Sequence, residues 1–248
     1  MDKYRLYERL SAQELLGWGI QTFGGKLAIA TSFQAAGMVI LDMSAQISNS
    51  LRVLTLDTGR LPGATFQMME TVRQRYGIQV ETVLPDPAEV EAMVKQHGAN
   101  LFYRDPGLRK LCCEIRKVRP LERKLKEFDA WVTGLRRSQN GSRAGLRKVE
   151  EKDGLVKISP LADWTTEEVD EYLRLHNVPR HPLYDQGYKS IGCAPCTRAV
   201  EAGEDERAGR WWWEQDAVKE CGIHFSPDGE VRRGVDVSLD QVLKGANA

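Results

Sequence analysis

The chain has 248 residues, of which 42% are hydrophobic, and its 35 lysines and arginines balance 35 aspartates and glutamates. This length suffices for one or two domains, and a net charge of zero does not support a general attraction to nucleic acid or membranes. Its apolar runs are far shorter than the ~20 residues of a membrane-spanning helix. Its N-terminus is charged and lacks the apolar core of a signal peptide, so we expect a cytoplasmic protein.

Helix and strand patterns alternate along most of the chain. Ser11 and Glu14 have the spacing of a capping box at the first helix, and Gly77 closes the third. Helices are predicted at residues 11–24, 34–47, 63–77, 86–98 and 165–177, and strands at 25–33, 51–59, 78–85, 129–137 and within 155–164. This alternation predicts an α/β fold with a mostly parallel, doubly wound sheet.

The regular pattern stops after about residue 180, where the chain becomes rich in Gly, Cys, Arg and Trp. We expect residues 1–248 to form a single domain, with an α/β core up to about residue 180. Residues 181–248 are predicted to form a loop-rich appendage that ends in a polar, mobile tail.

The first strand ends in "TSFQAAG", residues 31–37. Small and hydroxyl residues that open onto a helix N-terminus suit an anion such as phosphate. The segment is neither a GxGxxG nor a GxxxxGK[ST] motif, so an ordinary strand–helix turn remains an equal alternative.

Five cysteines in a cytoplasmic chain are unlikely disulfide partners, because the cytosol keeps thiols reduced. The adjacent pair Cys112 and Cys113 and the CxxC pair Cys193 and Cys196 together fit a four-thiolate site for zinc or an iron–sulfur cluster. A redox dithiol at the CxxC pair is the rival interpretation, and inert cysteines are a third. Adjacent residues on a helix point about 100° apart, which disfavours an ordinary zinc ribbon without excluding zinc.

Cys221 is left over, in "KECGIH". Lys219 and His224 are cations close to it in sequence that would favour its thiolate, the nucleophilic form. Upstream, Arg207 and Arg210 are three residues apart and would share one side of a helical turn. Two guanidiniums on one side suit a phosphate or sulfate, although a solvated charge run is the common alternative.

The segments "CCEIRKVRPL", "TGLRRSQNGSR", "GCAPCTR", "GEDERAGRWWWE" and "ECGIH" resemble the assimilatory sulfonucleotide reductases over about residues 25–225. The paired cysteines resemble the iron–sulfur branch of that family, the adenylyl-sulfate (APS) reductases. The resemblance implies an adenine nucleotide alpha hydrolase-like (PP-loop) fold. "TSFQAAG" departs from the glycine-rich loop of ATP-using PP-loop enzymes, which fits a protein that does not cleave ATP.

The resemblance also implies roles for residues. Cys112, Cys113, Cys193 and Cys196 would ligate one [4Fe–4S] cluster, and Cys221 would be the catalytic nucleophile. Lys117 lies four residues past Cys113, which is one turn of an α-helix. The implied substrate-binding residues are Lys117, Arg207, Arg210 and His224 for the phosphosulfate, Leu56, Asp57, Thr58 and Gly134 for adenine and ribose, and Ser32, Arg136 and Arg143 as further nucleotide contacts.

The implied reaction is the thioredoxin-dependent reduction of APS to sulfite and AMP through a cysteine S-sulfonate, in assimilatory sulfate reduction and cysteine biosynthesis. A reductase of 3′-phosphoadenylyl sulfate (PAPS), or of both nucleotides, is the nearest alternative. A PP-loop enzyme that thiolates RNA and a zinc-stabilised nucleic-acid-binding module are more distant ones. APS and thioredoxin are therefore the expected partners, nucleic acid and membrane are not, and a homo-oligomer is left open.

Overall fold

The computed structural model describes residues 3–139 and 141–214. Its centre is a six-stranded sheet with the order β3-β2-β1-β4-β6-β5. The strands are β1 (Leu27–Ala30), β2 (Arg52–Leu56), β3 (Val80–Val83), β4 (Ala130–Val132), β5 (Val149–Lys152) and β6 (Leu155–Ile158). All neighbours pair in parallel except β5, which pairs with β6 in the antiparallel direction. The predicted α/β class with a mostly parallel sheet is confirmed.

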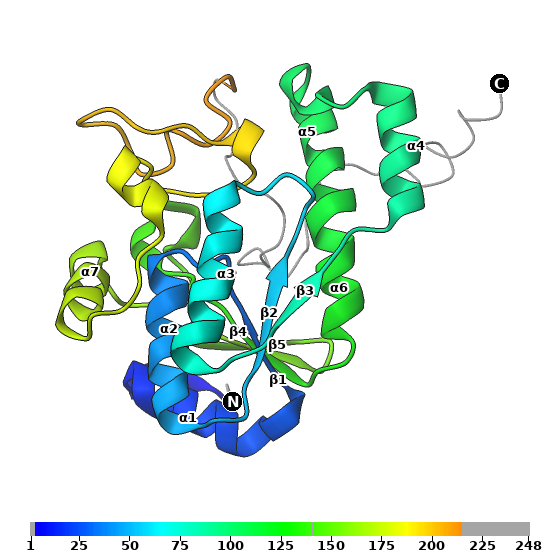
Figure 1. Ribbon diagram of the computed structural model, residues 1–248. Coiled ribbons are helices and arrows are strands. Elements are labelled where there is room, and N and C mark those ends of the chain that lie inside the picture. Colours follow the sequence, from blue (N-terminus) through cyan, green and yellow to red (C-terminus); the bar gives the residue numbers. More distant parts are fainter. Residues whose placement is uncertain (1–2, 140, 215–248) are drawn as a thin grey trace.

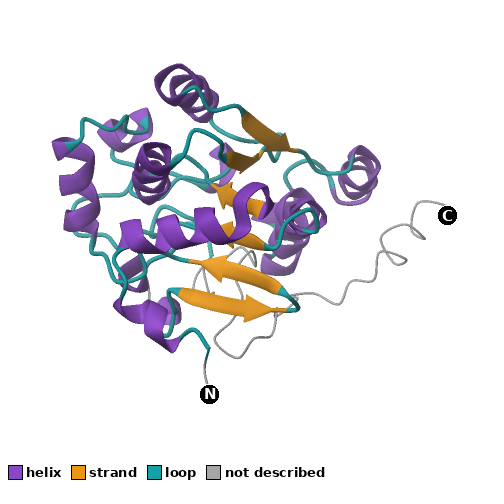
Figure 2. Ribbon diagram, turned by 90° about the horizontal axis from the view of Figure 1, so that it is seen from below, coloured by secondary structure: helices purple, strands orange, loops and turns teal. Residues whose placement is uncertain are grey.

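Helices cover both faces of this sheet (Figures 1 and 2). They are α1 (Ala12–Phe23), α2 (Ala35–Ile47), α3 (Gly63–Tyr76), α4 (Pro87–His97), α5 (Pro106–Cys113), α6 (Arg119–Leu125) and α7 (Thr166–Leu175). Buried side chains of α1, α2, α3 and α7 share one apolar core with inward-facing residues of the sheet. Leu121 and Leu125 of α6 pack on the other face, against Ala28, Leu54 and Trp131. The sheet is therefore doubly wound, as predicted.

Local signals in the sequence explain where several helices begin and end. Ser11 and Thr165 each form a complete capping box, at α1 and α7, and these boxes satisfy amides that a helix start leaves unpaired. The Asp105 side chain accepts hydrogen bonds from two amides at the start of α5, directly before Pro106. Gly77 ends α3 in the left-handed conformation that glycine adopts without strain.

The strand β5 is absent from the sequence prediction. It is an edge strand, "VEEK", whose central residues are both glutamates, and it carries little apolar signal. Asp153 and Gly154 connect it to β6 with φ values of 52° and 81°. Two consecutive left-handed residues form the tight turn that joins antiparallel strands.

The helical run between α4 and β4 is also absent from the prediction. The helix α5 continues through a π-helical segment, Glu114–Val118, into α6. Pro120 lies at the start of α6 and lacks an amide hydrogen. Lys117 is thus not one α-helical turn beyond Cys113, because a π-helix closes its hydrogen bonds between residues i and i+5.

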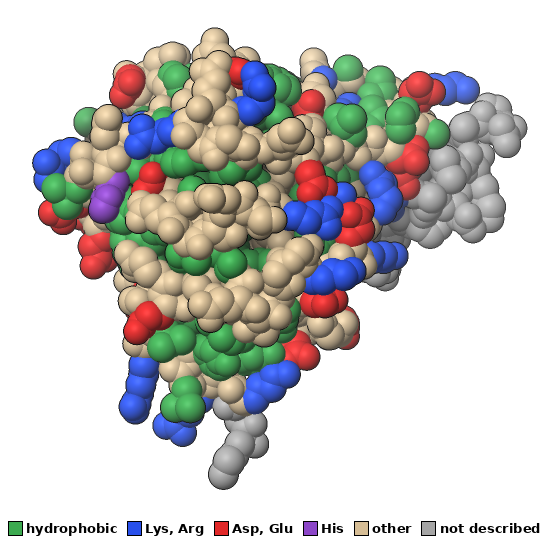
Figure 3. Space-filling model, turned by 60° about the horizontal axis from the view of Figure 1, so that its bottom comes forward, with side chains coloured by type: hydrophobic (Ala, Val, Ile, Leu, Met, Phe, Trp, Pro, Cys, Tyr) green, Lys and Arg blue, Asp and Glu red, His purple; other side chains and the backbone are tan. Residues whose placement is uncertain are grey.

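No helix within residues 3–139 and 141–214 combines the length and apolarity that a bilayer-spanning segment requires. On the face shown in Figure 3, acidic and basic side chains are interspersed and do not gather by sign. This face therefore presents no continuous basic surface of the kind that binds a nucleic-acid backbone.

Candidate active site

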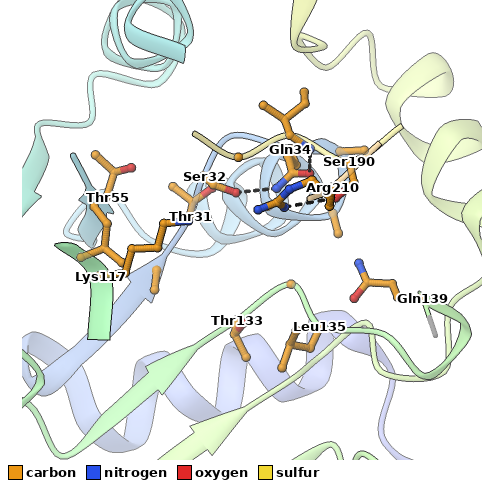
Figure 4. A pocket seen from close by; sticks show the side chains of 18 of the residues that line it. Thr31, Ser32, Gln34, Thr55, Lys117, Thr133, Leu135, Gln139, Ser190 and Arg210 are labelled. Atoms are coloured by element: carbon orange, nitrogen blue, oxygen red, sulfur yellow. Dashed lines mark hydrogen bonds between the residues drawn. The ribbon is translucent and has the colours of Figure 1, made fainter. Parts of the chain in front are cut away.

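A cavity lies at the carboxyl ends of β1 and β4, where the strand order reverses direction. Open α/β sheets bind their ligands at such a point. The cavity has a volume of about 270 Å³. Its walls come from the exits of β1, β2 and β4, from Lys117, and from two segments of the appendage, residues 189–193 and 206–210. Figure 4 places Lys117 beside Thr31 and Thr55, and Arg210 beside Gln34 and Ser190.

The turn between β1 and α2 is held by its own side chains. Thr31 Oγ1 accepts a hydrogen bond from the Phe33 amide at 2.9 Å, and Phe33 has a left-handed φ of 56°. Gln34 donates to Ser32 Oγ at 2.9 Å and accepts from the Ile191 amide at 2.8 Å (Figure 4). Gln34 thereby ties the turn to the appendage, a contact that the sequence prediction did not include.

Gly134, at the exit of β4, faces the start of α2. A Cβ at this position would lie 3.2 Å from the Ala36 Cβ and 3.3 Å from the Gly37 nitrogen. The two walls of the cavity therefore approach each other so closely here that a side chain would force them apart. This close approach gives a physical reason for glycine in the predicted turn.

Basic side chains line the cavity at Lys117, Arg136, Arg143, Lys189, Arg207 and Arg210. Arg136 is oriented by Thr166 Oγ1, which accepts bonds of 3.2 Å from both of its terminal nitrogens. Burial lowers the pKa of Arg136, and the carboxylate of Glu206 opposes that shift. Arg143 donates to Gln139. Such a lining suits a ligand with several negative charges.

Glu206 also lines the cavity and is absent from the sequence prediction. Its carboxylate accepts a 2.8 Å hydrogen bond from Thr166 Oγ1, the same hydroxyl that receives Arg136. In sequence it sits in the charged run "GEDER", where glutamates are ordinarily solvated. Nothing local distinguishes it from its neighbours.

The four cysteines of the two predicted pairs lie together. Cys112 and Cys113 end α5, Cys193 precedes a 3₁₀ turn (Ala194–Cys196), and Cys196 ends it. All four are buried and line one small cavity of about 10 Å³, together with Arg60, Phe102, Arg109, Arg116 and Lys117. Lys117 lines both cavities, so it lies between the cysteines and the larger site.

Burial and nearby positive charges shift the pKa values of these thiols in opposite directions. Burial raises the pKa of Cys196 to about 12 and also raises the pKa of Cys112. Burial would raise that of Cys193 too, but Lys117, a hydrogen bond with Thr58 and the charge of Arg210 together bring its pKa below the usual value. The surroundings of Cys193 therefore favour a thiolate.

The four thiols can be compared with the ligands that an iron–sulfur cluster or a single metal ion requires. Four thiols that face one void, with Lys117 and Arg116 beside them, offer the ligands of an iron–sulfur cluster and cations to offset its negative charge. The void has about the volume of one water molecule. Within the described residues, no three Cys, His, Asp or Glu side chains are grouped so as to hold a single metal ion.

The structure brings together most, but not all, of the residues that the sequence singled out. Those that line the larger cavity are Ser32, Leu56, Thr58, Lys117, Gly134, Arg136, Arg143, Cys193, Arg207 and Arg210. Asp57 is not among them, and its carboxylate accepts a 2.8 Å bond from the Gly59 amide. Cys221 and His224 lie outside the described residues, so their predicted roles stay predictions.

Comparison with known proteins agrees with this geometry. The model of the phosphoadenosine phosphosulfate reductase domain family matches residues 26–199. A protein of Allochromatium vinosum named adenosine 5′-phosphosulfate reductase is 47% identical over 206 residues, covering 81% of this chain and 80% of its own. A protein of the same name from Burkholderia cepacia is 46% identical over 203 residues, covering 81% of each chain.

Solved structures extend the likeness to the fold. A phosphoadenylyl-sulfate (PAPS) reductase from Candida auris, in a phosphate complex, superposes with a TM-score of 0.66 at 32% identity and covers 79% of this chain and 93% of its own. An FMN adenylyltransferase from Candida glabrata, with FAD and pyrophosphate, has a TM-score of 0.53 at 14% identity, covers 86% of this chain and 75% of its own, and shares the fold alone. The chain belongs to the phosphoadenosine phosphosulfate reductase family.

Proposed function

We propose that this protein reduces adenosine 5′-phosphosulfate to sulfite and AMP, with thioredoxin as the reductant. The observation that carries the proposal is the cavity at the switch point of the sheet, which is lined with cations and adjoins a buried cysteine quartet. Two relatives at 46–47% identity bear the name of this activity. Sulfate assimilation for cysteine synthesis is the corresponding physiological role.

The proposed first step is attack of the Cys221 thiolate on the sulfur of the sulfate group. The bond between that sulfur and the bridging oxygen of the phosphate breaks, and AMP leaves with the electron pair. The products are AMP and a Cys221 S-sulfonate. Both reactants are anions, so cations must offset their repulsion; Lys117, Arg207 and Arg210 line the cavity and would do so, with His224 as a further contact.

In the proposed second step, a thioredoxin thiolate attacks Cys221 Sγ, and sulfite leaves with the electrons of the broken sulfur–sulfur bond. The second thioredoxin thiol then closes the thioredoxin disulfide and releases the Cys221 thiolate. Thioredoxin thus supplies both electrons. The reaction therefore needs no other electron donor, so a bound cluster need not carry electrons and would act by positioning or by its charge.

The cluster itself is part of the proposal. Cys112, Cys113, Cys193 and Cys196 would hold one [4Fe–4S] cluster, which would supply a fixed local charge beside the cavity. Lys117 lies between this site and the larger cavity, so its ammonium group would act on both. The nucleotide would contact Ser32, Leu56, Thr58, Gly134, Arg136 and Arg143, and Asp57 would contribute through the turn that it holds.

The decisive experiment joins metal analysis to an assay. Protein purified without oxygen should contain about four irons per chain and release sulfite from APS in the presence of reduced thioredoxin. Cys221→Ser should bind APS but form no adduct with the mass of one SO₃ group. Sulfite release by Cys221→Ser would contradict the assignment of the nucleophile. Zinc in place of iron, with no sulfite release, would favour a metal-stabilised binding module.

A PAPS reductase, or an enzyme that uses both nucleotides, is the second candidate. It is favoured by the similarity to the Candida auris PAPS reductase at 32% identity. The two substrates differ by a 3′-phosphate, so the ratio of kcat/KM for APS and PAPS decides between the candidates. We expect APS to be preferred, because the two relatives at 46–47% identity bear the name of the APS-reducing activity.

A further inference from the structure

Trp211 is the most deeply buried part of the triple-tryptophan segment, and two guanidinium groups lie over its ring. Its side chain has no exposed surface, and its backbone adopts a left-handed φ of 42°. The Cζ atom of Arg109 lies 4.4 Å from the ring centroid and that of Arg210 lies 4.6 Å from it. A non-glycine residue in this conformation persists only when the surrounding structure imposes it.

Arg109 holds the indole from the side of the cysteine quartet. It lies on α5 three residues before Cys112 and is fully buried. Its Nε and Nη2 atoms donate to the two carboxylate oxygens of Glu214, each at 2.9 Å. This bidentate pair neutralises Arg109, and the Trp211 amide donates to the Cys196 carbonyl at 3.2 Å. The ring is therefore fixed to both cysteine segments.

Arg210 extends from the same indole into the larger cavity. Its side chain is buried, and its Nη1 atom reaches Ser190 Oγ only at 3.5 Å (Figure 4). Its Nε atom is buried and has no hydrogen-bond partner in the described part of the chain. A Cβ at Gly192 would lie 2.6 Å from its Cζ atom. The guanidinium is thus oriented by flat packing between Gly192 and Trp211 more than by hydrogen bonds.

We propose that Arg109, Trp211 and Glu214 are positioning residues that fix the guanidinium of Arg210 in the substrate cavity. The inference rests on the proposed function, in which Arg210 binds the phosphosulfate group. Because Glu214 neutralises Arg109, Arg210 is the cation of this stack that remains to face an anion. A guanidinium that is held before the ligand arrives loses less conformational freedom on binding and stabilises developing charge better.

The test is equilibrium binding of APS, AMP and adenosine to the metal-loaded protein. Trp211→Leu removes the aromatic face, and we expect the Kd for APS to rise about 5- to 30-fold, the range of a buried cation–π contact. Adenosine lacks the group that Arg210 contacts, so its Kd should not change. Trp211→Phe keeps an aromatic face and should recover most of the loss.

Arg109→Lys is a second variant that tests whether Arg210 is positioned through Trp211. Lysine keeps a positive charge for Glu214 but loses the planar fork that stacks on the ring, so the Kd for APS should rise a few-fold while that for adenosine stays constant. Phe128→Leu is the matched control. It removes another arginine–aromatic contact, in which Arg52 Cζ lies 4.2 Å from the Phe128 ring, at the amino end of the sheet. It should bind all three ligands as the wild type does.

The outcomes separate the inference from the function on which it rests. Wild-type affinity for APS in soluble, metal-loaded Trp211→Leu or Arg109→Lys would overturn the inference. So would an equal loss of affinity for APS and adenosine, because this indicates a general structural defect. If Trp211→Leu does not fold, Arg109→Lys alone decides. Failure of the wild-type protein to bind APS would instead contradict the proposed function.

Discussion

The Oγ1 atom of Thr58 lies 3.2 Å from Cys193 Sγ, and this contact joins the end of β2 to the CxxC segment across 135 residues of sequence. The same oxygen accepts a bond from the Arg60 amide at 3.2 Å, and its hydroxyl hydrogen is available to donate to a Cys193 thiolate. The Ala194 amide donates to the Arg60 carbonyl at 2.8 Å and strengthens the connection. The cysteine quartet and the carboxyl edge of the sheet are therefore one connected structure.

Thr58→Val should weaken retention of a metal group at the cysteines. Valine is similar in size but cannot donate to Cys193, and a hydrogen bond to a charged acceptor contributes about 1.5–3 kcal/mol. We expect iron to be lost to a chelator about tenfold faster, which corresponds to ~1.4 kcal/mol. Loss of the visible absorption measures this rate. Thr58→Ser keeps the hydroxyl and should behave as the wild type; equal rates in all three proteins would contradict the prediction.

Gly192→Ala should lower the affinity for APS. The new methyl group would occupy space now taken by the guanidinium of Arg210, whose Cζ atom would be 2.6 Å away, so Arg210 must leave its position. We expect a rise of about tenfold in KM, on the scale of one lost charge-assisted contact. Gly25→Ala is the control, because a Cβ there meets nothing within 4 Å. An unchanged KM in Gly192→Ala would show that Arg210 tolerates displacement.

We expect protonation of the buried His181 to lower the stability of the folded protein at mildly acidic pH. Its Nδ1 atom accepts from the Leu183 amide at 3.3 Å, so its Nε2 atom carries the hydrogen and donates to Thr65 Oγ1 at 3.1 Å. Burial lowers the pKa of His181, whereas the unfolded chain binds a proton below pH ~6.5. Stability from this group is thus complete above that pH and falls as the pH drops towards the folded pKa.

Urea unfolding between pH 7.5 and 5 measures this effect. The contribution of one histidine cannot exceed about 1.4 kcal/mol per pH unit. His181→Gln should show a shallower pH dependence than the wild type. The ion-paired Glu81, whose pKa Arg52 lowers to about 2, contributes equally in both proteins and cancels from the comparison. Identical slopes for the two proteins would assign the acid sensitivity to other groups.

Two glycine-to-alanine substitutions should change stability in opposite directions. Gly154 has a φ of 81° in the turn between β5 and β6, and alanine there should destabilise the protein by about 1–2 kcal/mol. Gly17 lies inside α1, where alanine should stabilise by up to about 1 kcal/mol. A Cβ at either position meets nothing within 4 Å, so backbone conformation alone decides. Urea unfolding of both variants would refute this account if their shifts had the same sign.

Much of the fold could be predicted because its signals are local. The runs around Ala28 and Leu54 are apolar and short, as buried parallel strands are, and Ser11 marks the start of α1 by its capping box. The edge strand β5 could not be found in this way. Its glutamates belong on a solvated edge, and they resemble those of a loop.

The residues of the candidate site likewise differ in whether the sequence around them marks them as functional. Lys117 and Arg210 could be named because they lie beside distinctive cysteine and tryptophan motifs. Glu206 and Arg109 could not, because their partners are distant in sequence: Thr166 lies 40 residues away and Glu214 lies 105 residues away. Asp57 differs from both, because its carboxylate accepts a bond from the Gly59 amide in a local turn and does not line the cavity.

The π-helical segment Glu114–Val118 makes the spacing of this region intolerant of length changes. A π turn accommodates one residue more than the surrounding α-helix would, and here it lies between the cysteine pair at the end of α5 and the start of α6. Removing one residue would restore a regular α-helix and rotate Cys112 and Cys113 by about 100° about the axis relative to α6. A deletion within this segment, natural or engineered, would therefore turn the cysteine pair of α5 away from Cys193 and Cys196, whereas a substitution leaves the spacing of the helix unchanged.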